Sequence, residues 1–301
     1  MNSVTVIVIA ITLVVIAGPL LAGLTGLIRA RHEPPVSLPR WRWQLTIASA
    51  LLYVLAFNLT FFIQELFLVL PKALTPGLRP TLFHNNHSWQ GDHALSHLFQ
   101  GTGALAVLIV GSSCMRLLRS GVSSPVARLF LIWMAYNGCF QALPQVVVGA
   151  INPQNDVGMA MDYFQMSATA KTVAALVALV AMPLVASWLA KALLGVAESP
   201  ALIATARART RFIFLAATLP ALIAIVAIIP FRLPRELIEV VILPVIVTVT
   251  GLVWIQATAW RYPALTATGH SVSWPLARLV AAVIGLLLVF QLVLKPGIQF
   301  F

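Results

Sequence analysis

Residues 45–70 read LTIASALLYVLAFNLTFFIQELFLVL, and Glu65 is the only charged side chain among them. A helix needs about 20 apolar residues to span the roughly 30 Å of hydrocarbon in a bilayer, so this stretch predicts a membrane-spanning helix. The apolar run is continuous and lacks an alternation of period two, which argues against a strand of a membrane β-barrel. The stretch therefore places the chain among the helical membrane proteins.

Similar apolar stretches recur along the whole chain. The predicted spans are residues 4–28, 45–70, 94–115, 129–149, 170–190, 211–230, 237–258 and 276–294. The composition agrees, because 60% of the 301 residues are hydrophobic and only 9% are charged, whereas about a quarter of the residues in water-soluble domains are charged. We expect an all-α, polytopic membrane helix bundle of about eight transmembrane helices, forming a single integral membrane domain over residues 1–301.

The basic residues predict how the bundle is oriented. The net charge is +11, from 19 Lys and Arg against 8 Asp and Glu. Most of the basic residues lie in the alternate connections 29–43, 116–128, 191–211 and 259–278, whereas the opposite side holds only Lys72, Arg79, Lys171, Arg232, Arg235 and Lys295. The positive-inside rule then places both termini on the extracytoplasmic side. The basic loops are expected to contact anionic lipid of the bilayer, and no nucleic-acid partner follows from them.

The first span and the cysteines narrow the setting further. The first span has no basic segment before it and an arginine cluster after it, so we expect an uncleaved signal anchor. Cys114 and Cys139 both lie inside apolar runs, which argues against a disulfide framework and against a cysteine-ligated metal. Compact loops favour the bacterial cytoplasmic (inner) membrane as the location.

Most residues capable of acid, base or ligand chemistry fall on the predicted extracytoplasmic side. His93 and His97 are four residues apart at the start of a predicted helix, so they share a face and are spaced for one metal ion. Asp92 is expected to cap this helix, and His84 and His87 precede it as a third and a fourth ligand. Two other interpretations stay open, namely hydrogen bonding at the membrane interface and a proton relay.

Glu65 lies at a similar depth, one turn below the outer end of its span. A carboxylate in a bilayer is expected to face the bundle interior, either paired or protonated. Amide side chains of the second, third and fourth spans accompany it: Asn58, Gln100, Asn137, Gln141 and Gln145. The amides serve either as interhelical hydrogen bonds or as the lining of a polar pocket. We expect the three spans to enclose a pocket open to the outer surface.

The residues Gln64-Glu65-Leu66-Phe67-Leu68 resemble a degraded His-Glu-x-x-His helix of the site-2-type intramembrane metalloproteases. Gly101-Thr102-Gly103-Ala104 in the third span and Asn155-Asp156 after the fourth extend the resemblance. Members of that family use zinc, with the Glu of the motif as base and an Asp as third ligand. The resemblance carries over only Glu65 and Asp156, because the residues at the two histidine positions cannot replace imidazole.

Three functions follow as hypotheses, and the sequence does not decide whether the chain is an enzyme. In the first, a divalent metal such as zinc is bound and Glu65 is the base that activates a metal-bound water for hydrolysis. The metal ligands in this hypothesis are His84, His87, His93, His97 and Asp156.

The second hypothesis is a proton- or cation-coupled transporter in which Glu65 binds the ion. The inner halves of the spans, around residues 47–55 and 106–110, are mainly apolar and argue against a continuous polar path. The third is a noncatalytic membrane subunit or assembly factor that docks with another membrane protein. The lack of Walker, Rossmann and nucleophile-elbow motifs favours this third hypothesis.

Overall fold

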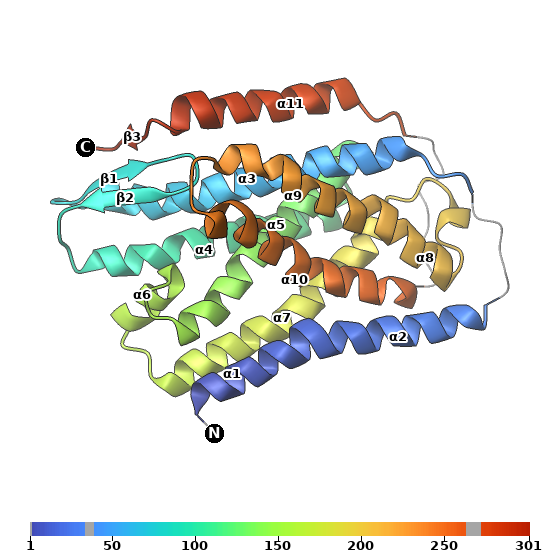
Figure 1. Ribbon diagram of the computed structural model, residues 1–301, viewed down its shortest axis with the longest axis horizontal. Helices are drawn as coiled ribbons and strands as arrows, with labels where there is room; N and C mark the ends of the chain where they lie inside the picture. Colours follow the sequence, from blue (N-terminus) through green and yellow to red (C-terminus); the bar gives the residue numbers. More distant parts are fainter. Residues whose placement is uncertain (1, 34–38, 263–271) are drawn as a thin grey trace.

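The computed structural model describes residues 2–33, 39–262 and 272–301, and these residues are mostly helical (Figure 1). Parts of the basic connections 29–43 and 259–278 therefore lie outside the described residues. The α-helices are α1 (Ser3–Ile11), α2 (Gly18–Arg31), α3 (Trp43–Ala73), α4 (Leu95–Arg119), α5 (Pro125–Ile151), α6 (Asp156–Tyr163), α7 (Ala168–Leu194), α8 (Ala206–Ile213), α9 (Leu219–Arg232), α10 (Leu243–Thr258) and α11 (Leu276–Leu288).

Short π-helical and 3-10 segments extend these helices. The π segments are η1 (Thr12–Ala17), η3 (Phe214–Thr218), η4 (Ile238–Ile242) and η6 (Val289–Leu294), and the 3-10 segments are η2 (Pro200–Leu202) and η5 (Ala259–Arg261). Each of these π segments ends two residues before a proline, at Pro19, Pro220, Pro244 or Pro296. Proline lacks an N–H and its ring crowds the carbonyl four residues back, so the preceding turn widens.

Seven helical segments within the described residues are long and apolar enough to cross a membrane. They are Ser3–Arg31, Trp43–Ala73, Leu95–Arg119, Ala168–Leu194, Ala206–Arg232, Ile238–Arg261 and Leu276–Leu294, close to seven of the predicted spans. The remaining predicted span, residues 129–149, corresponds to α5. This helix is as long as its neighbours, but its amides lower its hydropathy and it is not among the seven.

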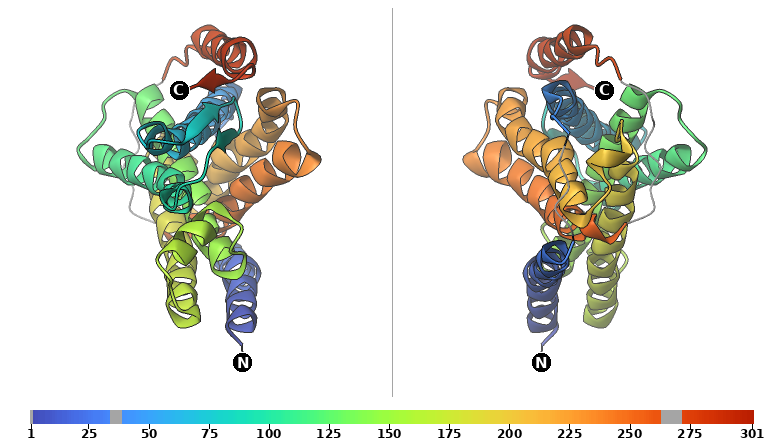
Figure 2. Two further views of the ribbon diagram at one scale, coloured as in Figure 1. Left: turned by 90° about the vertical axis from the view of Figure 1, so that its left-hand side faces the viewer. Right: turned by 90° about the vertical axis from the view of Figure 1, so that its right-hand side faces the viewer.

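Helix α3 lies in the core of the bundle and packs against α4, α5 and α9. Helix α11 runs along one side of this core, and α1–α2 run along the other side next to α7 and α10 (Figures 1 and 2). These outer helices leave most of their apolar side chains exposed, Leu20, Leu24 and Leu292 among them. An apolar surface of this extent is expected of helices that face lipid.

Gly103 and Gly111 of α4 bring neighbouring helices into close contact. Gly111 faces Gly138 of α5, where an added Cβ would lie 2.8 Å from the Cα of Gly111. A Cβ at Gly103, also in α4, would lie 2.8 Å from the backbone carbonyl oxygen of Gln64 in α3. Small residues permit such backbone approaches in membrane bundles. The second contact holds the start of α4 against the polar end of α3.

A small sheet covers that end of the bundle, where the all-α expectation did not include strands. Strands β1 (Arg79–Leu82) and β2 (His87–Gln90) form an antiparallel hairpin with Leu82 opposite His87, and β3 (Ile298–Gln299) pairs with the other edge of β1. The N-terminal end of α1 and the C-terminal residues lie at this same end of the bundle (Figure 1).

Candidate functional site

The β1–β2 hairpin positions the histidine that contacts the intramembrane carboxylate. His87 is the first residue of β2, and its backbone N–H donates to the side-chain oxygen of Asn86 in the turn (2.8 Å). Side chains two residues apart in a strand point to the same side, so His87 and Trp89 lie together, with stacked rings whose centroids are 5.7 Å apart.

The His87 ring meets Glu65 of α3. Nδ1 of His87 lies 2.8 Å from Oε2 of Glu65, and each of these side chains is only 6% exposed. On the other side of the ring, Nε2 lies 3.1 Å from Oε1 of Gln100 at the start of α4. The imidazole therefore bridges α3 and α4, with hydrogen-bond partners at both nitrogens.

Lys72 completes this arrangement from the last turn of α3. It is fully buried, and its ammonium lies 3.1 Å from Oε1 of Gln100, 3.3 Å from Nε2 of His87 and 4.3 Å from the centroid of the Trp89 ring. Lys72 follows Glu65 by seven residues, so both project from the same helical face. From the sequence, Lys72 was expected only to indicate the orientation of the bundle, although its spacing of seven residues from Glu65 places both on one helical face.

Asp156 lies within electrostatic reach of these groups. It is the first residue of α6, whose N-terminus is capped by the Asn155 side chain. Burial, followed by the charge of Glu65, raises the pKa of Asp156 from 3.8 to about 6, while His87 and Lys72 act in the opposite direction. The polar cluster, as used below, comprises Glu65, Lys72, His87, Gln100 and Asp156.

The other predicted metal ligands are not hydrogen-bonded to this cluster within the described residues. Nε2 of His84 is 3.1 Å from the carbonyl oxygen of Leu233, and burial followed by nearby basic side chains lowers its pKa. Nδ1 of His93 accepts from the Leu95 N–H (3.2 Å), and His97 is exposed on α4. Within the described ranges, no three His, Cys, Asp or Glu side chains are grouped to hold a metal ion. Metal binding thus gains no structural support.

The predicted cap at Asp92 is wrong. Helix α4 begins at Leu95, its N-cap residue is Ala94, and Asp92 is exposed. The His93 ring, rather than the aspartate, accepts the first free backbone N–H of the helix. Neither His93 nor His97 forms a hydrogen bond with Glu65 among the described residues.

The amides of α5 connect it to α3, at the level of Glu65 and just over one turn below it. Nε2 of Gln145 donates to Oε1 of Gln64 (2.9 Å), and Nε2 of Gln141 donates to Oγ1 of Thr60 (2.9 Å). Asn58 and Asn137 instead donate to carbonyls of their own helices. The buried oxygens Oδ1 of Asn137 and Oε1 of Gln141 accept no hydrogen bond from the described residues.

Buried polar groups continue past the midpoint of α3, among the mainly apolar residues 47–55. The Tyr53 hydroxyl lies 2.7 Å from Oγ1 of Thr248 in α10, and Oγ of Ser49 accepts from the indole of Trp133 (3.0 Å). We call the following buried polar side chains the polar row of α3: Thr46, Ser49, Tyr53, Thr60, Gln64, Glu65 and Lys72.

Comparison of the chain with protein-family models, with curated proteins and with solved structures finds no match. The resemblance to the site-2-type metalloproteases accordingly rests on its sequence motifs alone. In the structure, Gln64 pairs with Gln145, and Glu65 pairs with a histidine from the hairpin. What the site can do therefore has to be argued from its own chemistry.

Proposed function

We propose that this chain is a membrane transporter that carries protons, in which the polar cluster binds and releases the proton. The observation that carries this proposal is the buried Glu65–His87 hydrogen bond of 2.8 Å, with a cationic donor and an amide acceptor at the other ring nitrogen. Ionisable groups are rare within membrane-spanning segments, and they commonly serve proton or ion pathways.

Both protonation states of His87 find hydrogen-bond partners. In the neutral ring, Nδ1–H donates to Glu65, and Nε2 accepts from the Lys72 ammonium at 3.3 Å. In the protonated ring, Nε2–H donates instead to Oε1 of Gln100 at 3.1 Å. A proton can thus bind or leave at Nε2 without leaving a buried polar atom unpaired, which would otherwise oppose one of the two states.

Asp156 supplies the exchange of protons with water. It is half-buried, and its pKa of about 6 lies near neutral pH, so it is partly protonated under ordinary conditions. Its electrostatic coupling to Glu65 and His87 means that a proton on one group changes the affinity of the others. We assign Asp156 to the solvent end of the relay.

The polar row of α3 supplies a route from the cluster toward the other end of the bundle. Two buried acceptors of α5, Oδ1 of Asn137 and Oε1 of Gln141, lie beside this row and can bind a proton-carrying water molecule. An acceptor left unpaired in a bilayer costs free energy, so a transport route is a physical reason for keeping both.

The arrangement of the chain ends supports a transmembrane route. Both described chain ends lie at the hairpin end of the bundle (Figure 1), and we take α5, which is as long as its neighbours, as a further crossing helix beside the seven apolar ones. The positive-inside rule then assigns the hairpin end, and the polar cluster with it, to the extracytoplasmic side.

A metal-dependent hydrolase is less well supported by the same geometry. The Lys72 ammonium already lies beside His87 and Gln100, and its charge compensates Glu65 and Asp156. A divalent cation placed there would be repelled at close range. The hydrolytic hypothesis also needs His93 and His97, whereas among the described residues the side chain that hydrogen-bonds to Glu65 is His87.

Proton flux into liposomes tests the proposal. The purified chain is reconstituted with a pH-sensitive dye inside the vesicles, and a potassium diffusion potential drives protons inward. We expect flux with the natural chain, the flux of empty vesicles with Glu65→Gln or His87→Gln, and full flux with Glu236→Gln, an exposed control at the same end. Flux with Glu65→Gln equal to that of the natural chain would contradict the proposal.

A further inference from the structure

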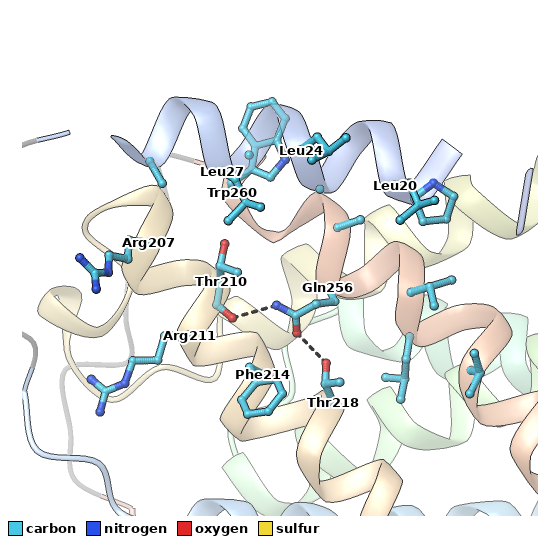
Figure 3. A pocket seen from close by; sticks show the side chains of 18 of the residues that line it. Leu20, Leu24, Leu27, Arg207, Thr210, Arg211, Phe214, Thr218, Gln256 and Trp260 are labelled. Atoms are coloured by element: carbon cyan, nitrogen blue, oxygen red, sulfur yellow. Dashed lines mark hydrogen bonds between the residues drawn. The ribbon is translucent and has the colours of Figure 1, made fainter. Parts of the chain in front are cut away.

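A large groove lies away from the polar cluster, between α2 on one side and α8, η3 and α10 on the other (Figure 3). Its volume is about 1010 Å³. The walls are apolar side chains of membrane-spanning helices, including Leu20, Leu24 and Leu27 of α2 and Leu222 of α9. In a bilayer, such a groove is open to the acyl chains of surrounding lipid.

Two tryptophans fix the width of the groove by holding α2 at a distance. The indole N–H of Trp254 donates to the carbonyl oxygen of Val14 (2.8 Å), and that of Trp260 donates to the carbonyl oxygen of Ala22 (3.0 Å). In the π segment before Pro19, the Gly18 N–H bonds to Leu13, one residue further back than in an α-helix. The carbonyl of Val14 is thereby free to accept from the indole.

The polar groups at the floor of the groove are already paired with each other. Nε2 of Gln256 donates to the carbonyl oxygen of Thr210 (3.0 Å), and Oε1 of Gln256 accepts from the hydroxyl of Thr218 (2.6 Å) (Figure 3). The polar groups of the floor therefore need no further hydrogen-bond partner, and a hydrocarbon chain can lie on them without leaving them unpaired.

The rim of the groove carries two arginines of α8. Arg207 is exposed and Arg211 is half-buried, and neither forms a hydrogen bond or an ion pair with the described residues. Their spacing of four places them on one helical face, where like charges repel. By contrast, Arg209 is buried and donates to the carbonyl oxygens of Ile203, Ala204 and Trp260.

We propose that this groove binds one anionic phospholipid, with an acyl chain between α2 and α10 and the phosphate held by Arg207 and Arg211. The arginines stand at the end of the span Ala206–Arg232, the level of the lipid headgroups. Guanidinium pairs bind phosphate oxygens through several N–H donors, and the bound anion relieves the repulsion within the pair. The lipid site does not depend on proton transport.

Native mass spectrometry of the detergent-purified full chain tests this assignment by titration with phosphatidylglycerol or with phosphatidylcholine of the same acyl chains. We expect preferential binding of phosphatidylglycerol. The double variant Arg207→Gln/Arg211→Gln is expected to weaken it roughly 30-fold, from about 1 kcal/mol for each basic residue. The matched control Arg116→Gln/Arg119→Gln removes two exposed arginines of α4 and should leave binding unchanged. The conservative variant Arg207→Lys/Arg211→Lys should retain most of the affinity for phosphatidylglycerol.

A second variant separates a lipid site from a phosphate site. A Cβ at Gly23, which lines the groove, meets no atom within 4 Å, so Gly23→Leu adds a side chain at the wall of the groove. We expect it to weaken phosphatidylglycerol binding without lowering the melting temperature, with Gly285→Leu as the matched control. Any of three results would overturn the proposal. The first is equal binding of both lipids, and the second is natural affinity in the Arg207→Gln/Arg211→Gln variant. The third is displacement of the lipid by inorganic phosphate together with no effect of Gly23→Leu.

Discussion

His87 and Glu65 are 22 residues apart in the chain, yet Nδ1 of the histidine lies 2.8 Å from Oε2 of the glutamate. The pair joins a surface hairpin to the buried face of α3. Charged side chains held this far from solvent need partners, because removing one member of a buried pair leaves an uncompensated charge. The stability of this end of the bundle should therefore depend on charge balance within the polar cluster.

Replacing Lys72 by methionine tests that balance. The variant removes the cation beside His87 and leaves two carboxylates near each other, so we expect the free energy of unfolding to fall by about 3 kcal/mol. Adding Glu65→Gln should recover a large part of this loss, because the double variant has one charge fewer to compensate. Chemical denaturation in detergent measures both, and Lys191→Met, at an exposed position of α7, should change little. Strictly additive effects of the two substitutions would show that the charges are not coupled.

Asp156 gives a prediction about pH. Its pKa in the folded chain, about 6, is above its ordinary value of 3.8, so the folded state binds the proton more tightly. The contribution of this group to stability is therefore fully present below about pH 4, decreases as the pH rises, and is lost above about pH 6. Asp156→Asn cannot ionise, and relative to the natural chain it should gain about 1–2 kcal/mol between these limits, after allowance for partial exposure. Parallel melting curves from pH 4 to 7 for both proteins would exclude this effect.

The contact between α4 and α5 gives a prediction about packing. A Cβ at Gly138 would lie 2.5 Å from the carbonyl oxygen of Val107, so Gly138→Ala should destabilise the chain by about 1–3 kcal/mol. Gly285 of α11 has no neighbouring atom within 4 Å of its Cβ position, and alanine there should stabilise the helix by about 0.5–1 kcal/mol. Opposite signs in the two melting temperatures are expected. Equal shifts would mean that helix propensity, rather than close contact, sets both.

The spans could be predicted from the sequence because hydropathy is a local property that follows directly from residues such as those of 45–70. The burial of Glu65 could be predicted as well, since a carboxylate exposed to lipid is costly. The hydrogen-bond partner of Glu65 could not be predicted from the sequence. Strands of four residues carry little periodic signal, so the hairpin that delivers His87 was not predicted.

The spacing of His93 and His97 suggested a metal site, but α4 begins two residues later than that hypothesis assumed, and the His93 ring accepts from its own backbone. Lys72 was missed for a different reason. A lysine at the end of a span ordinarily extends to the interface, and only the tertiary structure shows that it is covered by Trp89 and Gln100.

The most direct test of the account is nitrogen NMR of the ¹⁵N-histidine-labelled chain in bilayers across a pH titration, with the His87 signal assigned by its loss in His87→Gln. The account predicts that Nε2 of His87 gains and loses a proton while Nδ1 remains a donor to Glu65, and that Glu65→Gln changes this titration but His97→Gln does not. A His87 ring that keeps one tautomer throughout, or that titrates identically without the Glu65 carboxylate, would contradict the account.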